Sequence, residues 1–317
     1  MKLPSILSLI QNENMKIYRR FGTWFMIALL ALSTLAGALI TKATHKEPKN
    51  WKAEVASEIK EMEAQLSEEK VPKMYKNHLE QQLKINEYRL EHNIKPVASN
   101  TFWGYLVNSA DIIALITLFT IIVAAGSVAN EFSWGTIKLL LIRPASRTKI
   151  LLSKYIAALL FALCMLLLLF VFSSVVGAIV FGIENIREPY LAYQNGTVVE
   201  KSMLLHVMQV YALNCVDLVM MTTFAFMISA VFRNHSLAVG LATFALFAGP
   251  QITTLLAMKF DWAKYLLFAN TDLTQYIDGT PLVEGMTMPF SMMMLLIYFV
   301  IFNALTWFIF RKRDIAA

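Results

Sequence analysis

The sequence predicts an all-α polytopic membrane protein: six transmembrane helices, an amphipathic interfacial helix at the N-terminus and an extracellular helical hairpin. Two observations carry this prediction. Hydrophobic residues make up 57% of the 317 residues and charged residues only 16%, whereas about a quarter of the residues in a soluble globular protein are charged. Long apolar segments also recur along the chain, and a helix needs about twenty apolar residues to cross a bilayer core.

The net charge of +6 indicates orientation in a membrane rather than nucleic-acid binding. The cations gather at the ends of apolar segments and not on one face, as expected when Lys and Arg mark the cytoplasmic side. Cys164 and Cys215 lie inside apolar segments, so neither a disulfide nor a metal site is expected there. We expect no removable signal peptide, because the N-terminal residues lack a short apolar core followed by a small-residue cleavage site.

The first region, residues 1–40, is expected to contain the interfacial helix and the first transmembrane helix. The apolar residues between positions 3 and 18 fall on one helical stripe, which polar residues interrupt too often for a span. Arg19 and Arg20 follow. This pattern predicts an amphipathic helix lying in the cytoplasmic interface, with a disordered basic tail as the alternative. Residues 21–40 are long and apolar enough for the first span.

Residues 41–100 predict the extracellular helical hairpin. Acidic and basic residues nearly balance here, and apolar residues recur every three or four positions on both sides of Pro72. We therefore expect two antiparallel helices with a turn at Pro72. Solvated helix faces explain the charges. The functional alternative is that the hairpin contacts a substrate, a twin subunit or a sensor partner.

Residues 101–317 are expected to hold the other five spans. The expected ranges are 101–128, 150–180, 203–232, a fifth span from Ser236, and 289–310. Gly249 and Pro250 are expected to interrupt the fifth span, because proline removes a backbone donor. Residues 183–202 are expected to form an outer loop with a turn at Asn195. The aromatic-rich segment 257–289 is expected to be an outer re-entrant or interfacial element. Lys and Arg counts place both termini in the cytoplasm.

A polar and basic connection, residues 131–154, joins the second span to the third. It carries the carboxylate of Glu131 and five cations, which are Lys138, Arg143, Arg147, Lys149 and Lys154. A positive excess in a short connection marks the cytoplasmic side. Residues 139–142 are expected to form a short amphipathic helix that Pro144 ends, and Ser146 is expected to N-cap the next helix.

The order of residues in this connection resembles the first cytoplasmic loop of ABC-2 type transporter permeases. The residues that carry the resemblance are Glu131, Gly135, Thr136, Leu140, Pro144, Ser146 and Arg147, with Arg143 beside them. The resemblance implies a coupling helix that docks on a separate ATP-binding subunit. It also implies a dimer with a second permease, identical or paralogous, in the bacterial cell membrane. The 60-residue hairpin departs from the short connection of the simplest family members. An ordinary basic loop is the alternative.

No catalytic residue, metal site or cofactor is expected in this chain itself. It has no G-x-x-x-x-G-K-[ST] phosphate loop, so the resemblance implies that ATP and Mg²⁺ are bound by the partner subunit. An H-E-x-x-H zinc pair and a G-x-S-x-G nucleophile turn are also absent from the sequence. The chain is therefore not expected to be an enzyme by itself.

Asp217 is the costliest residue to bury in the predicted spans, at about 2.5–3.5 kcal/mol on insertion scales. His206, Gln209 and Asn214 are expected on the same side of the helix, so the four residues are a candidate translocation path. The alternative is that Asp217 is protonated or hydrogen-bonded between helices.

Three functions follow from the sequence. The first is ATP-driven export of an amphipathic compound such as a peptide antibiotic, a drug or a lipid-like molecule. The second is a membrane-anchored sensor or assembly factor that acts through the hairpin. The third is an ion- or proton-coupled carrier that uses Asp217.

Overall fold

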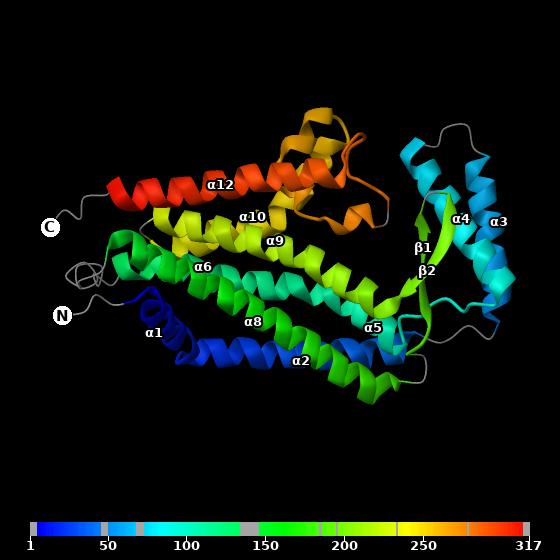
Figure 1. Ribbon diagram of the computed structural model, residues 1–317, viewed down its shortest axis with the longest axis horizontal. Coiled ribbons are helices and arrows are strands. Elements are labelled where there is room, and N and C mark those ends of the chain that lie inside the picture. Colours follow the sequence, from blue (N-terminus) through cyan, green and yellow to red (C-terminus); the bar gives the residue numbers. More distant parts are fainter. Residues whose placement is uncertain are drawn as a thin grey trace.

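The computed structural model describes residues 5–45, 50–67, 73–133, 146–183, 186–194, 196–232, 234–277 and 279–312. Within these ranges six helical segments are long and apolar enough to span a membrane, so the chain is a multi-pass membrane protein, as predicted. They are α2 (Phe21–Thr44), the segment Phe102–Glu131, α8 (Arg147–Phe181), α9 (Met203–Val231), α10 (His235–Ala257) and α12 (Met288–Lys312). Figure 1 shows α1 (Ile6–Tyr18) and the C-terminal end of α12 at the same end of the bundle.

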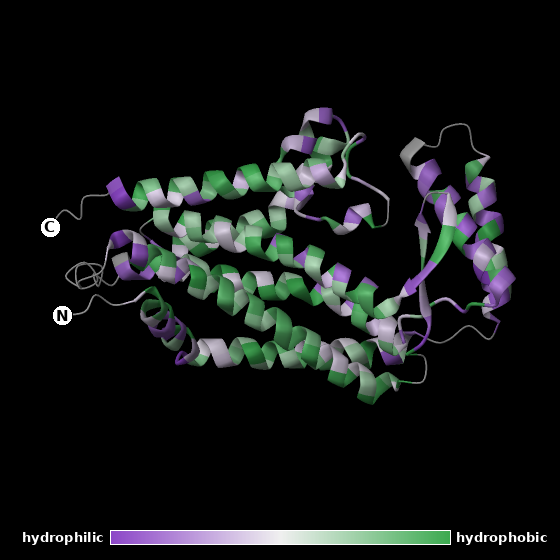
Figure 2. Ribbon diagram, viewed as in Figure 1, coloured by the Kyte–Doolittle hydropathy of each residue, from purple (hydrophilic) through white to green (hydrophobic). Residues whose placement is uncertain are grey.

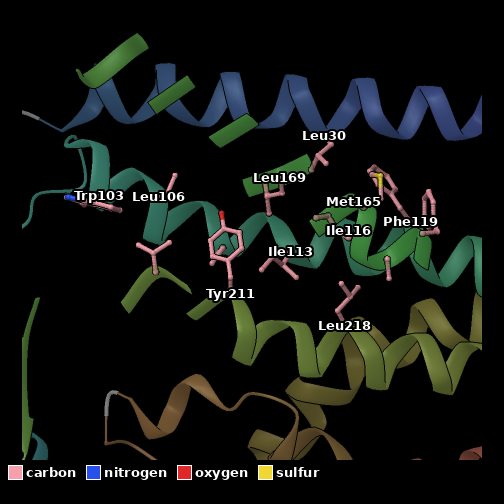
Figure 3. Close-up of a cluster of buried hydrophobic side chains, with 14 of the residues drawn as sticks. Leu30, Trp103, Leu106, Ile113, Ile116, Phe119, Met165, Leu169, Tyr211 and Leu218 are labelled. Atoms are coloured by element: carbon pink, nitrogen blue, oxygen red, sulfur yellow. The ribbon is translucent and has the colours of Figure 1, made fainter. Parts of the chain in front are cut away.

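The second span is not one regular helix. It consists of α5 (Phe102–Asn108), the 3-10 turn η1 (Ser109–Ile112) and α6 (Ile113–Ser133). α6 packs against α8, α9 and α10, so it lies at the centre of the bundle, and its side chains contribute to the largest apolar cluster (Figure 3).

Polar bonds between helices reinforce this core. The hydroxyls of Ser109 and Tyr211 lie 2.7 Å apart, and the Tyr105 hydroxyl donates to the Thr34 carbonyl at 2.7 Å. Lipid tails are as apolar as leucine, so close packing and such bonds, rather than hydrophobic burial, hold membrane helices together.

The outer helices present apolar side chains to their surroundings. In α10 only Ala238, Ala242 and Thr253 are buried, whereas Phe244 and Leu255 are 64% and 67% exposed. Figure 2 shows the apolar colouring along the whole length of the bundle. These faces match a hydrocarbon solvent, in which every backbone group must be satisfied inside the helix.

The predicted helical hairpin is confirmed by α3 (Trp51–Leu66) and α4 (Lys73–His92), which pack against each other at the end of the bundle opposite α1 (Figure 1). Asn50 caps α3 by accepting a hydrogen bond from the Ala53 amide at 3.2 Å. The expected turn at Pro72 lies outside the described residues.

The outer loop after the third span contains a β-hairpin, so the all-α prediction was incomplete. β1 (Pro189–Gln194) pairs antiparallel with β2 (Thr197–Ser202), and Gln194 lies opposite Thr197. Gly196 has a φ of +89°, which glycine adopts readily. The sequence predicted only a turn here, although an Asn-Gly pair with Tyr and Leu residues before it and Thr-Val-Val after it is typical of a β-hairpin.

The expected interruption of the fifth span at Gly249 and Pro250 was wrong, because α10 continues through both residues to Ala257. Transmembrane helices tolerate proline where neighbouring groups satisfy the freed carbonyl. The glycine has a packing role instead. A Cβ atom at Gly249 would lie 2.2 Å from the ring of Phe268, so this ring packs directly against the α10 backbone.

The segment between α10 and α12 is held by buried polar groups. It contains η2 (Asp261–Tyr265), α11 (Leu267–Asn270) and η3 (Thr274–Tyr276). The Asn270 amide donates to the carbonyls of Lys264 and Leu266, both at 2.8 Å. The Ser291 hydroxyl of α12 donates to Asn270 Oδ1 at 2.6 Å. Asn270 is fully buried, so these bonds fix the segment onto α12.

Candidate functional site

Four charged side chains from three helices form a cluster at the α1 end of the bundle. This charge cluster consists of Glu13 and Lys16 of α1, Glu131 of α6 and Lys154 of α8. Lys154 Nζ lies 2.9 Å from Glu13 Oε2 and 2.8 Å from Glu131 Oε1. Lys16 Nζ lies 2.6 Å from Glu13 Oε1 and 3.7 Å from Glu131 Oε1. Each cation therefore contacts both carboxylates.

The cluster depends on Lys154, whose side chain is only 4% exposed. Burying a lone ammonium is very costly, so a buried lysine needs opposite charge within hydrogen-bonding distance. The same contacts change the pKa of the Glu13 carboxyl. Burial by itself raises the pKa of the Glu13 carboxyl, but the charges and hydrogen bonds of Lys154 and Lys16 outweigh burial and lower this pKa below its ordinary value.

The charge cluster joins the end of α6 to the beginning of α8, the two helices that residues 134–145 connect. Glu131 lies near the end of α6, and Lys154 lies about two turns into α8. α1 packs along α8, so its Glu13 and Lys16 reach both sides of the connection.

The predicted coupling loop is described only in part. Gly135, Thr136, Leu140, Arg143 and Pro144 lie outside the described residues. Ser146 is the N-cap of α8, as predicted, and its hydroxyl accepts a hydrogen bond from the Lys149 amide at 3.3 Å. Arg147 is exposed at the start of α8.

A set of hydrogen bonds joins α6 to α9 close to Glu131. The buried Ser229 hydroxyl of α9 accepts hydrogen bonds from the amides of Val128 and Ala129, at 3.3 and 2.9 Å. It donates to the Ala125 carbonyl at 2.5 Å. One side chain of α9 therefore forms hydrogen bonds with three backbone groups of α6. These bonds couple the position of α9 to that of α6.

The four candidate path residues do not gather at one place. The Asn214 side-chain amide donates to the Val210 carbonyl of its own helix at 2.9 Å. The Asp217 carboxyl is half-buried, interacts with the Thr271 side chain and lies near Asp272, so it faces the segment between α10 and α12. This contact fits the alternative that Asp217 is bonded between elements of the fold.

His206 and Gln209 instead line a cavity of about 340 Å³ beneath the helical hairpin. This hairpin cavity is bounded by α4, the β-hairpin, the start of α9 and the residues around η3. Its lining includes Gln81, Arg89, Tyr190, Lys201, His206 and Gln209. The rings of His206 and Tyr190 stack, with centroids 3.6 Å apart.

Sequence reasoning missed two features of these sites. Glu13 and Lys16 lie in the predicted interfacial helix, and nothing in the local sequence indicates their contacts with Lys154 and Glu131. Arg89 and Lys201 appeared as solvated charges of outer segments. A signal existed for Lys154, which stands among apolar residues at the start of a span.

Comparison with known proteins places the chain in a family. It is 49% identical over 315 residues to a protein of Bacillus subtilis (strain 168) named "Uncharacterized protein YhcI", covering 98% of this chain and 100% of the relative. It is 33% identical over 216 residues to "Uncharacterized membrane protein YdbK" of the same strain, covering 68% of this chain and 83% of the relative. Residues 76–316 match the model of the family described as "Protein of unknown function (DUF2705)", and the chain therefore belongs to that family.

Proposed function

We propose that this chain is the membrane-spanning permease subunit of an ABC-2 type transporter, which exports an amphipathic compound with ATP hydrolysed by a separate subunit. In this proposal both termini and the connection 134–145 face the cytoplasm of a bacterial cell. The excess of Lys and Arg at that end of the spans supports this orientation.

The observation that carries the proposal is the charge cluster. On this proposal the driving force comes from ATP hydrolysed by a partner, because this chain has no ATP-binding motif, and the connection between α6 and α8 has the residue order for contact with that partner. Glu131 and Lys154 link both sides of this connection to α1. Ser229 links α6 onward to α9. A displacement of the connection would therefore reach four helices.

Copurification tests the proposal. The chain is expressed together with a candidate ATP-binding subunit from the same organism, extracted in detergent and isolated through a tag on the chain. The wild type is expected to retain the ATP-binding subunit, whereas a Leu140→Asp, Arg147→Glu double variant is expected to lose it with membrane insertion unchanged. Lys60→Glu, a charge reversal on the exposed face of α3, is the control and is expected to behave as the wild type.

If the wild type captures no ATP-binding subunit with ATP, with ADP or without nucleotide, the permease proposal is rejected. If the double variant binds as well as the wild type, the connection is not the coupling element.

A second function, detection of a ligand by the helical hairpin, is favoured by the hairpin cavity, since α4 forms one of its walls. In that case a membrane sensor kinase, and no ATP-binding subunit, is expected to copurify with the wild type. Removing residues 51–93 would then abolish kinase capture.

A further inference from the structure

We propose that the hairpin cavity binds a small molecule or a lipid headgroup through an oxyanion, a phosphate or a carboxylate. The cavity lining contains two basic side chains, Arg89 of α4 and Lys201 of β2. Among the described residues, no aspartate or glutamate lines it. Glu58 of α3 balances part of the Arg89 charge from outside the cavity, so the wall itself presents positive charge to which an anion would bind.

Two buried nitrogen atoms on the lining residues have no hydrogen-bond partner in the described part of the chain. They are Nε of Arg89 and Nδ1 of His206. Buried polar atoms are almost always hydrogen-bonded, so two unpaired nitrogens on residues that line one cavity mark an incompletely satisfied site, which a bound anion would complete once these side chains turn towards the cavity. Arginine presents a planar set of donors that suits phosphate and carboxylate oxygens.

The hairpin holds Arg89 in place. Arg89 Nη1 donates to Asn86 Oδ1 at 3.2 Å, and Asn86 Nδ2 donates to Glu58 Oε2 at 3.1 Å. Asn86 is only 2% exposed, so the hydrogen bonds that join Glu58 of α3 to Arg89 of α4 through Asn86 are shielded from solvent. Glu58 thus supports the guanidinium from behind and is not among the lining residues.

The size of the cavity indicates that the oxyanion is one part of a larger polar molecule. Its volume of about 340 Å³ lies within the range of small-molecule sites, about 300 to 1,000 Å³. The remaining wall offers glutamine amides and the stacked ring of Tyr190. The cavity is lined by His206 and Gln209 in the first turns of α9, and Figure 1 shows the start of α9 at the end of the spans next to α4. The oxyanion therefore has two possible sources: a dissolved molecule or an anionic lipid headgroup.

The proposal depends on neither function proposed above, and its test uses the purified full chain alone. Thermal unfolding is measured in detergent with inorganic phosphate or citrate, against potassium chloride at matched ionic strength. In a second arm, the chain is placed in nanodiscs of phosphatidylcholine with or without phosphatidylglycerol. Stabilisation by the dissolved anions assigns a soluble ligand, and stabilisation by phosphatidylglycerol alone assigns a headgroup.

Variants identify the site. Lys201→Gln and Arg89→Lys are each expected to weaken the stabilising anion's apparent affinity about tenfold, because the first removes a cation and the second removes the planar pair of guanidinium donors. Arg89→Lys keeps the charge beside Glu58, so the hairpin is expected to remain folded. Arg187→Gln removes an exposed cation just before β1 and is expected to leave the affinity unchanged. If neither arm stabilises the wild type, or if all three variants respond as the wild type does, the proposal is overturned.

Discussion

A lysine with a side chain exposed to only 4% is held here by two carboxylates from different helices. The sequence marked Glu131 and Lys154 as charges that orient a loop. The structure shows instead that Lys154 bridges Glu131 and Glu13, which lies 141 positions away along the chain. No local pattern predicts that contact, because it depends on how α1 packs along α8. The opposite charges of the cluster neutralise one another, so removing one charged side chain leaves a buried charge without its partner.

Lys154→Met is therefore expected to destabilise the chain by about 3–5 kcal/mol, because Glu13 and Glu131 both lose the buried ammonium that lies between them. The measurement is thermal unfolding in detergent. Limited proteolysis in parallel should show α1 cleaved earlier than in the wild type. Lys149→Met, at an exposed position in the first turn of α8, is the matched control. Equal unfolding temperatures for the two variants would show that the charge cluster does not hold α1.

At the scale of elements, the local sequence determines where helices form. Packing against neighbouring elements determines whether a helix is interrupted. Proline at position 250 suggested an interruption, but α10 continues to Ala257. The nearby glycine is needed because Phe268, in α11, packs against the backbone at that point. The β-hairpin illustrates the opposite case. Its Asn-Gly signal is visible in the sequence, and the aromatic and β-branched residues on either side of the pair favour strands.

Gly249→Ala is expected to destabilise the fold by about 1–3 kcal/mol, because the added methyl group would lie 2.2 Å from the Phe268 ring. Gly240→Ala is the control within the same helix. A Cβ atom there meets nothing within 4 Å, so this variant is expected to be neutral or slightly stabilising. Both are compared with the wild type by thermal unfolding. Adding Phe268→Leu to Gly249→Ala is expected to restore part of the loss, and no recovery would contradict direct contact as the cause.

For the whole molecule, the arrangement separates two possible centres of function. Figure 1 shows α1 at one end of the spans and α4 with the β-hairpin at the other. The charge cluster includes two residues of α1, and the hairpin cavity is bounded by α4 and the β-hairpin. α6, α8 and α9 run between them, and their packing forms the continuous core of the bundle. The two ends are therefore expected to be separable in experiments on partner binding, even if they are linked during transport.

Removal of residues 51–93 tests this separation. On the permease proposal, the shortened chain is expected to retain the ATP-binding subunit in copurification, while its response to a transported compound changes. The control is a chain in which the same segment is replaced by a Gly/Ser linker of equal length, which keeps the spacing between the first two spans. Loss of the ATP-binding subunit from both shortened chains, with insertion intact, would show that the hairpin and the connection do not act as separate modules.

The sequence by itself determined the membrane class, the approximate limits of the six spans and the two-helix hairpin. These depend on bilayer thickness and helical periodicity, which act over neighbouring residues. Only the tertiary structure decided that Lys154 meets Glu13, that Asp217 and His206 face different surroundings, and that Arg89 and Lys201 share one cavity. These contacts depend on which helices pack together and at what rotation, and side chains far apart in the sequence set that arrangement jointly.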